Sequence, residues 1–466
     1  MKTALINTNC MKPPIAPIGL EYVAENMRAA GHDIGILDLC FVNDPLEAIR
    51  DFFSESEYEL VGLSLRNSDD CAFSSKQSFL GDFKDMVSEV RKCSDALVIA
   101  GGVGFSVMPE RILEISGADA GIWAEGEFAL PYLADQLKRN QDWRDASNLV
   151  WKDGDQWKRN PPTSMPLSEL PFMKRDLFDN PRYFREGGQA GFETKRGCPM
   201  KCTYCADPLS KGKMVRTRPP EHVATEIENL LSRGIDHFHT CDAEFNIPEE
   251  HAKEVCREFI NRGLGDKIRW YAYCSPKPFS RELSGLMKKA GCVGINFGTD
   301  TGDAAMLQKL GRSYSSEDII TSSNLARDEG MAVMLDLLIG APGETRESIK
   351  NTIDVMRQSG ADRIGVTVGV RLYPGTSLTS DVLQDNNKEG LHGSDDPLYP
   401  MFFIEPALGM NIFGIIDELI GEDERFLFFD PNRPGKNYNY NANEVLVNAI
   451  KKGHRGAYWD ILRKLV

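Results

Sequence analysis

The chain has 466 residues, of which 41% are hydrophobic and 26% charged, and this composition excludes fibrous, low-complexity and disordered proteins. Its 69 acidic and 54 basic residues give a net charge of −15, which disfavours nucleic acid as the main partner because a phosphate backbone is bound by a basic surface. No apolar run is long enough to span a bilayer, and eleven cysteines without an export signal predict reduced thiols in a cytoplasmic protein.

Residues 1–145 alternate short apolar runs with amphipathic stretches such as Ile18–Ala30 and Phe128–Lys138. The apolar runs are typical of buried parallel strands: Ala4–Asn7, Ile34–Leu39, Leu60–Leu65, Ala96–Ala100 and Gly121–Ala124. This alternation predicts a doubly wound, Rossmann-like α/β domain, which binds ligands outside the carboxyl ends of its strands. Three loops at those ends are rich in polar residues or glycine: Leu65–Asp69, Gly101–Gly104 and Glu125–Glu127. None matches a nucleotide-binding motif.

The alternation stops over residues 146–188, which we interpret as a linker. A turn signal, Lys152–Asp155, separates two short strand candidates, Leu149–Trp151 and Gln156–Arg159. Four prolines then mark an extended connection: Pro161, Pro162, Pro166 and Pro171.

Residues 189–378 resume the alternation with six longer strand-plus-helix units. Their strands are expected at Phe192–Thr194, His237–Cys241, Ile268–Cys274, Val293–Gly298, Ala332–Ile339 and Arg363–Val370. Six such units predict a partial (β/α)6 barrel of the TIM type, with its chemistry at the carboxyl ends of the strands. Residues 379–466 fit neither pattern and are predicted to form an accessory cap that could cover a substrate cavity. Its aromatic residues Tyr438, Tyr440 and Trp459 are expected in the core more often than at the substrate.

Three cysteines follow the first predicted barrel strand in a loop that contains glycine and proline. Cys198, Cys202 and Cys205 have the spacing CxxxCxxC, and three thiolates can bind zinc or an iron–sulfur cluster. Zinc would need a fourth ligand, and no CxxC or HxxxH partner stands nearby in the sequence. Three cysteines on a four-iron cluster leave one iron open for an external ligand.

This motif, placed after the first strand of a six-unit barrel, resembles the radical S-adenosylmethionine (SAM) superfamily over residues 190–375. The resemblance implies a 4Fe–4S cluster on Cys198, Cys202 and Cys205. It also implies that SAM binds the open iron and is cleaved to a 5′-deoxyadenosyl radical by an electron from an external flavodoxin- or ferredoxin-like donor. Further positions match the family's SAM-binding segments: Tyr204 and Gly340 near the adenine, Asp242 or Glu244 at the methionine amine, and Asp300, where a glutamate is usual, at the ribose.

The first domain resembles the cobalamin-binding domain that precedes the radical domain in one large subgroup. The resemblance implies a cobalamin site built from Ser64, Leu65, Arg66, Asn67, Gly101, Gly102, Val103, Glu125 and Gly126. The DxHxxG motif is absent, so the cobalt is expected to have no histidine ligand. Arg66 is expected against the lower face of the corrin, which a protonated guanidinium cannot coordinate. Alternatively, Arg66 pairs with Asp69 or Asp70 and only shapes the loop.

These features predict a cobalamin-dependent radical SAM methyltransferase that acts on an unactivated carbon. One alternative is a related enzyme that rearranges, cyclises or reduces its substrate without methyl transfer. Another is a cobalamin-sensing module with structural zinc. The acidic charge disfavours a third alternative, methylthiolation of tRNA. The substrate remains open among lipids, tetrapyrroles, peptides and small metabolites.

Overall fold

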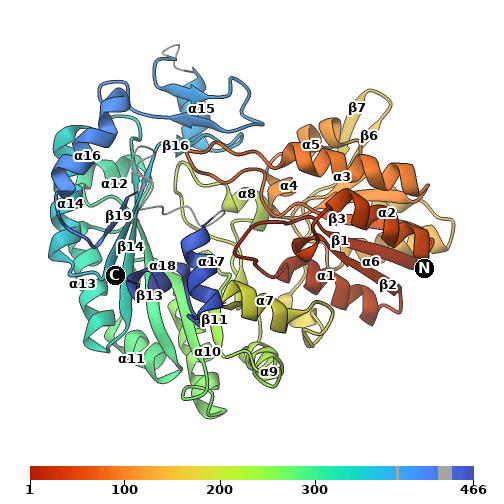
Figure 1. Cartoon of the computed structure of the whole chain (residues 1–466), viewed down its shortest axis with the longest axis horizontal. Helices are drawn as coiled ribbons and strands as arrows, with labels where there is room; N and C mark the ends of the chain where they lie inside the picture. The colour runs from red at the N-terminus through yellow and green to blue at the C-terminus, as the bar shows by residue number, and fades with distance from the viewer. Residues whose placement is uncertain (385–387, 429–442, 466) are drawn as a thin grey trace.

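The computed structural model describes residues 1–384, 388–428 and 443–465, and its first domain is built on a seven-stranded sheet (Figure 1). The strand order is β2-β1-β3-β4-β5-β6-β7, and the first five strands are parallel. They are β1 (Lys2–Asn7), β2 (Asp33–Asp38), β3 (Leu60–Ser64), β4 (Leu97–Gly101) and β5 (Ala120–Ile122). β2 lies on one side of β1, and β3 and the later strands lie on the other. The gap between β1 and β3 is therefore a topological switch point, where doubly wound sheets bind ligands.

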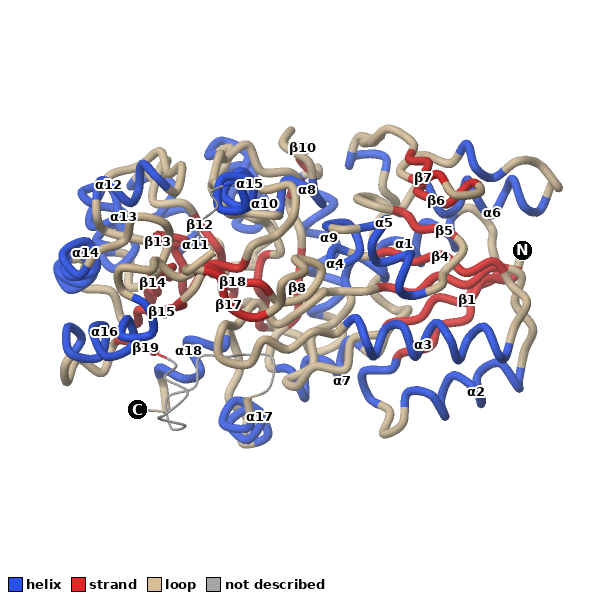
Figure 2. Tube along the Cα trace, turned by 90° about the horizontal axis from the view of Figure 1, so that it is seen from above, coloured by secondary structure: helices blue, strands red, loops and turns tan. Residues whose placement is uncertain are grey.

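Helices cover both faces of this sheet, so the predicted doubly wound fold is confirmed (Figure 2). Along β1, Ala4 and Ile6 belong to one core and Leu5 to the other, because successive strand residues point to opposite faces. The first core is closed by α2 (Pro45–Glu55), α3 (Leu80–Cys93) and α5 (Pro109–Ser116), and the second by α1 (Ile18–Ala29) and α6 (Ala129–Lys138).

The segment predicted as a linker contributes to the first sheet. Its hairpin, β6 (Leu149–Asp153) and β7 (Gln156–Arg159), pairs antiparallel with β5 because Leu149 and Val150 are fully buried in the two cores. The turn between them uses Gly154 at φ +59°. The connection that follows contains only one α-helix, α7 (Asn180–Gly187), within the part of the chain that the structure describes.

A second sheet of seven parallel strands forms the partial barrel. Its order is β19-β15-β14-β13-β12-β11-β8. The six predicted strands correspond to β8 (Ala190–Phe192), β11 (His237–Thr240), β12 (Arg269–Cys274), β13 (Cys292–Asp300), β14 (Ala332–Ile339) and β15 (Arg363–Val368). The seventh, β19 (Phe426–Phe428), comes from the segment predicted as a cap and pairs with β15 because Phe426 and Phe428 are buried in the barrel's core.

The outer face of this sheet packs against a row of helices. They are α9 (Pro220–Leu231), α10 (Glu249–Asn261), α11 (Arg281–Lys289), α13 (Ser316–Asp328), α14 (Arg346–Gln358) and α16 (Ile412–Ile420). None of the helices in the described ranges is both long and apolar enough to cross a membrane.

The C-terminal helix α18 (Tyr458–Arg463) closes the barrel interior at the amino ends of the strands. Trp459 packs edge-to-face on Tyr271 at 5.9 Å between ring centroids and also contacts Met334. The Tyr271 hydroxyl donates to Asp460 at 2.7 Å. Trp459 is therefore a core residue in the floor of the barrel, as favoured for the aromatics of this segment, and does not lie over the mouth. Tyr438 and Tyr440 lie outside the described residues.

A small antiparallel sheet lies between the two domains near the barrel mouth (Figure 1). Its strands, in order, are β16 (Val370–Arg371), β18 (Met401–Phe403) and β17 (Leu391–Gly393), and α15 (Ser377–Gln384) follows β16 in the chain. Phe73 of the first domain packs edge-to-face on Phe402 of this sheet at 5.6 Å. The cap thus joins the first domain to the barrel.

Candidate active site

The three cysteines lie in the loop between β9 (Lys195–Arg196) and α8 (Asp207–Lys211). Backbone hydrogen bonds fix the shape of this loop: the Cys198 amide donates to Gly212 at 3.1 Å and the Thr203 amide to Leu310 at 3.1 Å. Gly197 adopts φ +87°, and a Cβ there would lie 2.0 Å from the Met214 carbonyl oxygen. The local sequence therefore positions all three thiols in one loop before any cofactor binds.

This donor set fits an iron–sulfur cluster. Burial raises the pKa of each thiol, to about 11 for Cys202 and about 12 for Cys205. Cys198 also raises the pKa of both other thiols, and Cys202 raises that of Cys205. A positively charged metal centre would reverse this balance and favour the thiolates. Among the described residues, no three His, Cys, Asp or Glu side chains are placed to hold a single metal ion.

The two acidic residues predicted at the SAM amine have different environments. Asp242 accepts from the Thr194 hydroxyl at 2.6 Å and from two backbone amides, those of Thr194 at 2.9 Å and Lys195 at 3.2 Å. Glu244 is buried, its Oε1 lies 3.9 Å from Arg312 Nη1, and its Oε2 has no hydrogen-bond partner among the described residues. Burial raises the pKa of Glu244 to about 7. Asp242 therefore holds the start of the cysteine loop, and Glu244 is the carboxylate available to a cationic ligand.

Asp300 and Tyr204 contact each other directly. The Tyr204 hydroxyl lies 2.8 Å from both carboxylate oxygens of Asp300, and Arg312 donates to Asp300 at 2.5 Å and to the Tyr204 oxygen at 2.8 Å. Asp300 has φ +57°, a left-handed conformation that costs energy for a residue with a Cβ. In this structure the Asp300 carboxylate thus joins the cysteine loop to the end of β13, and its contact with the ribose stays a prediction.

The glycine-rich turn after β14 is held by a buried carboxylate. Gly340 has φ +104°, its amide lies 3.4 Å from a carboxylate oxygen of Glu344, and its carbonyl accepts from the Glu405 backbone amide at 2.9 Å. Glu344 also accepts from the Ser348 hydroxyl, and burial raises its pKa to about 7. The backbone of Gly340 is thereby fixed at the carboxyl end of its strand, beside the next loop of the barrel.

A ring of polar and aromatic side chains lines the barrel interior above the floor formed by Trp459. Asp336 accepts from the Tyr273 hydroxyl at 2.5 Å and from the Asn296 amide at 2.8 Å. The His239 ring lies 6.0 Å from that of Tyr273. Sequence reasoning missed these four residues, although each is a polar or aromatic residue at an inward position of a strand whose alternate positions are apolar.

The predicted cobalamin residues of β3 and β4 are brought together by tight backbone packing. The Leu65 amide donates to Gly101 at 2.8 Å, and the Gly104 amide donates to Leu65 at 3.1 Å. Gly102 adopts φ +99°, and a Cβ there would lie 2.4 Å from the Leu65 carbonyl oxygen. Val103, which follows in the turn, is 46% exposed. This surface can approach a large planar ligand closely, as the backbone of a glycine turn allows.

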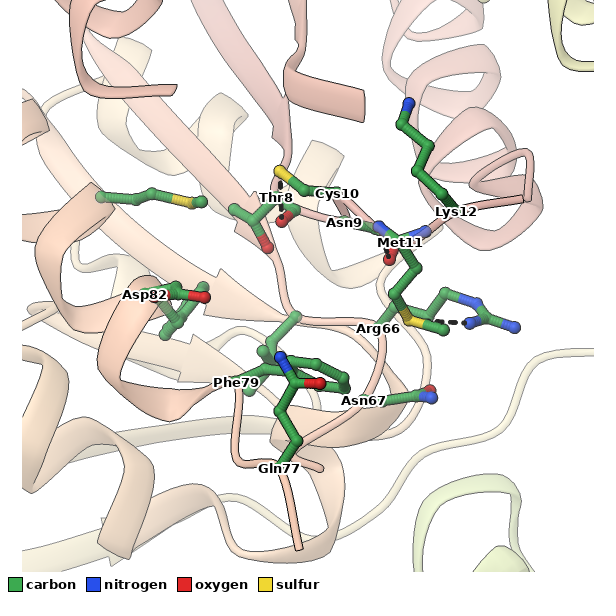
Figure 3. Close-up of a pocket in the computed structure, with 13 residues that line it drawn as sticks. Thr8, Asn9, Cys10, Met11, Lys12, Arg66, Asn67, Gln77, Phe79 and Asp82 are labelled. Atoms are coloured by element: carbon green, nitrogen blue, oxygen red, sulfur yellow. Dashed lines mark hydrogen bonds between the residues drawn. The ribbon is translucent and has the colours of Figure 1, made fainter. Parts of the chain in front are cut away.

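A cavity of about 270 Å³ opens next to this surface (Figure 3). It is lined by the segment after β1, by Arg66 and Asn67 after β3, and by Gln77 and Phe79 before α3. The β1 contribution, Thr8–Lys12, was missed, although a switch point between β1 and β3 is where a doubly wound sheet binds ligands. The Thr8 hydroxyl donates to the Ser64 carbonyl at 2.8 Å and so connects the two strand ends.

Arg66 is half-buried, and its Nη1 lies 3.7 Å from the sulfur of Met11 (Figure 3). In the described part of the chain it forms no ion pair. Of the two partners expected in the alternative, Asp69 and Asp70, Asp69 pairs with Arg371 instead. Desolvation lowers the pKa of Arg66, as expected for a cation held without a carboxylate.

Glu125 and Gly126 lie farther from this cavity, at the contact with the barrel. The Glu125 carboxylate accepts from Arg216 at 2.8 Å and lies 3.6 Å from Arg196, which also pairs with Glu127 at 2.5 Å. A contact between this loop and cobalamin would therefore come from the Gly126 backbone, since the Glu125 side chain holds the two domains together.

A second interdomain cluster is completely buried. Glu226 on α9 accepts from Arg175 at 2.6 Å, from Arg218 at 2.7 Å and from the Tyr22 hydroxyl at 2.8 Å. Arg175 also donates to Glu21 on α1 at 2.6 Å. Two cations and two carboxylates thus join the first domain, the linker and the barrel, which fixes the orientation of one cofactor site relative to the other.

Comparisons with known proteins agree with this architecture. The B12 binding domain family matches residues 4–134, and the radical SAM superfamily matches residues 192–356. Tryptophan 2-C-methyltransferase of Streptomyces laurentii is 30% identical over 98% of this chain and 95% of its own length. Cytidylyl-2-hydroxyethylphosphonate methyltransferase of Streptomyces wedmorensis is 23% identical over 86% of this chain and 83% of its own.

Solved structures give the same result. The radical SAM methyltransferase TsrM of Kitasatospora setae, with tryptophan and a SAM analogue bound, superposes with a TM-score of 0.93 at 27% identity over 100% of this chain and 99% of that one. A second TsrM structure, with cobalamin and a [4Fe–4S] cluster, has a TM-score of 0.91 at 26% identity over 99% and 97%. The predicted cofactors and methyl-transfer activity are confirmed: this chain belongs to the cobalamin-dependent radical SAM methyltransferases.

Proposed function

We propose that the enzyme methylates a carbon atom of a small aromatic substrate related to tryptophan. The proposal is supported by the likeness to tryptophan 2-C-methyltransferase, which extends over nearly all of both chains. A planar substrate with a ring N–H suits the barrel interior, where His239, Tyr273 and the floor residue Tyr271 provide aromatic surfaces.

Asn296 is the observation on which the substrate class rests. Its amide nitrogen donates to Asp336, which fixes the orientation of the side chain and leaves Oδ1 as an acceptor. Oδ1 is buried and has no hydrogen-bond partner among the described residues. Because an unpaired buried acceptor is costly, a ligand that donates a hydrogen bond there gains affinity. An indole N–H is such a donor.

The remaining assignments are part of the proposal and are supported by the match to the family's binding segments. Cys198, Cys202 and Cys205 would hold the cluster, Glu244 would accept the SAM amine, and the Gly340 turn would face the adenine. Bound cobalamin supplies methyl transfer through its cobalt. Leu65, Arg66, Gly102 and Val103 would form its binding surface, and Arg66 would keep its lower face positive and without a protein ligand. The reducing electron would come from a flavodoxin- or ferredoxin-like protein.

The test uses the anaerobically reconstituted enzyme with methyl-labelled SAM and a panel of aromatic compounds. We expect label to enter the ring carbon of an indole, and we expect Asn296→Leu to raise KM more than it lowers kcat. Asn351→Ala, on the outer helix α14, is the matched control. Transfer of label only to substrates that lack a ring N–H, or an unchanged KM in Asn296→Leu, would contradict this substrate class.

A further inference from the structure

The loop that carries Arg66 leaves the first domain and returns to it. It starts with Leu65, Arg66 and Asn67 at the end of β3 and comes back to the cavity at Gln77 and Phe79. Between these points it reaches the cap, where Phe73 packs on Phe402 and against the backbone of Gly369. Both ends of the loop line the candidate cobalamin site, and its middle is attached to a different part of the molecule.

Asp69 adds polar contacts between this loop and the cap to the apolar contacts of Phe73. Its Oδ2 accepts from Arg371 Nη2 at 2.9 Å and Nε at 3.1 Å, and its Oδ1 accepts from the Tyr373 hydroxyl at 3.1 Å. It also accepts from the Cys71 amide at 3.0 Å and the Ser68 hydroxyl at 3.2 Å. Asp69 is 2% exposed, so these contacts replace water around the carboxylate.

Arg371 is equally well held on the side of the cap. Its side chain is 2% exposed, and its remaining donors bind the carbonyls of Leu372 at 2.6 Å and Pro397 at 3.1 Å. The guanidinium therefore binds Asp69 through two nitrogen atoms, and backbone carbonyls of the cap hold it in this position. A lysine could neutralise Asp69 but could not make this paired contact.

The pair affects the charge of the cofactor site, whose lining also contains Lys12 and Asp82. Asp69 lies three residues after Arg66, and its charge is cancelled by Arg371 across the domain boundary. Arg66 forms no ion pair in the described ranges, and its Nη1 lies 3.7 Å from the thioether sulfur of Met11. The loop thus places the positive charge of Arg66 at the cavity, although the acidic residue Asp69 follows it closely in the sequence.

We propose that Arg371 is a positioning residue for cobalamin: by binding Asp69 it holds the Arg66 loop in place and keeps the Asp69 charge from neutralising that of Arg66. The inference rests on the proposed placement of cobalamin at Arg66. Reduction of cobalt(II) to cobalt(I) adds one negative charge, which a nearby cation stabilises. Without Arg371, the unpaired Asp69 carboxylate would oppose that reduction.

The sign of the effect can be measured in cobalamin-loaded protein by spectroelectrochemical titration of the cobalt(II)/cobalt(I) couple. A unit charge at roughly 10 Å in a medium of effective dielectric about 20 changes an equilibrium about tenfold. We therefore expect Arg371→Gln to lower the cobalt(I)/cobalt(II) ratio at fixed potential about tenfold, or ~59 mV for one electron. Asp69→Asn leaves Arg371 unpaired and should shift the ratio in the opposite direction.

Two further variants separate charge from loss of structure. The double variant Asp69→Asn/Arg371→Gln removes both charges and should return the potential close to that of the wild type. Arg111→Gln removes an exposed ion pair with Asp396, at 2.7 Å, that also joins the first domain to the cap, and it should leave the potential unchanged. If Arg371→Gln does not fold, Asp69→Asn and the double variant still test the sign.

The outcomes distinguish this inference from the proposed site. Wild-type protein that binds no cobalamin in the presence of an intact cluster would refute the site itself. Bound cobalamin with equal potentials in wild type, Arg371→Gln and Asp69→Asn would refute the role of Arg371. A shift of the same sign in both single variants and in the double variant would mean that the pair acts only as structural support, which also overturns the proposal.

Discussion

The buried cluster around Glu226 predicts a large loss of stability when one carboxylate is neutralised. Glu226→Gln keeps the shape of the side chain and removes its charge. In the wild type, Glu226 and Glu21 balance Arg175 and Arg218, and all four side chains are at most 2% exposed. The variant would leave two buried guanidinium groups with a single carboxylate.

The magnitude follows from the burial. Removing one partner of a buried ion pair typically costs about 3–5 kcal/mol, since the other charge remains out of water. Burial alone would raise the pKa of Glu226, but Arg218 and Arg175 outweigh it and lower the pKa. The carboxylate therefore contributes stability above its ordinary pKa, and this contribution is lost as the pH falls through the lowered value. With a urea dependence of about 3 kcal/mol per molar, a loss of about 3 kcal/mol lowers the unfolding midpoint by about 1 M.

The assay is equilibrium unfolding in urea, followed by tryptophan fluorescence at neutral pH. Glu228→Gln is the matched control, because Glu228 lies on the same helix and pairs with Arg262 at 2.8 Å at the surface, where a pair contributes about 0–1 kcal/mol. Equal midpoints for the two variants would refute the reasoning, because burial would then have no effect on the cost of losing the charge.

Three further predictions concern the cofactor sites. Cys202→Ala should lose most of its iron and its visible absorbance after anaerobic reconstitution, whereas Cys93→Ser should retain both. Iron and sulfide analysis measures this difference. A full complement of iron in Cys202→Ala would contradict the ligand assignment. Glu244→Gln should weaken SAM binding roughly 10- to 100-fold, as expected for a lost hydrogen bond to a charged group. Asp242→Asn should instead mainly destabilise the cysteine loop. Equilibrium binding of SAM to both reconstituted variants separates these two roles. The pKa of Glu344 is raised to about 7, so the folded protein favours the protonated carboxyl group. The protonated group contributes stability below the ordinary pKa of glutamate, and this contribution is lost as the pH rises through about 7. The thermal midpoint of the wild type should accordingly fall more between pH 5 and 8 than that of Glu344→Gln, and parallel curves would contradict this.

Both domains and the cluster loop could be predicted from the sequence because their signals are local. Burial on both faces makes parallel strands apolar throughout, so β1, β3, β4 and β14 are recognisable as runs of apolar residues separated by amphipathic helices. Three cysteines within eight residues reach one metal centre whatever the rest of the chain does. Gly102 and Gly340 adopt positive φ angles, which residues with a Cβ disfavour. A glycine directly after a predicted strand is therefore also a local signal that the sequence carries.

The choice among equivalent side chains could not be predicted, because it depends on contacts between distant segments. Asp242 and Glu244 are two residues apart and chemically alike, yet only the packing of Thr194 against Asp242 leaves Glu244 as the available carboxylate. Likewise, β19 is too short to be recognised alone, and it joins the barrel because the edge of β15 is open to it. Trp459 reaches the barrel floor for the same kind of reason: Tyr271 and Met334 present an apolar surface there.

The sequence by itself thus determined the two α/β domains, the cysteine motif and the kind of cofactors that they serve. The tertiary structure alone decided that Asp69 pairs with Arg371, 302 positions away, and that Asn296 presents an unpaired oxygen to the barrel interior. The physical reason is that motif spacing and strand periodicity are encoded within a few residues. Ion pairs and buried acceptors between domains depend instead on how complete elements pack, which no short stretch of sequence specifies.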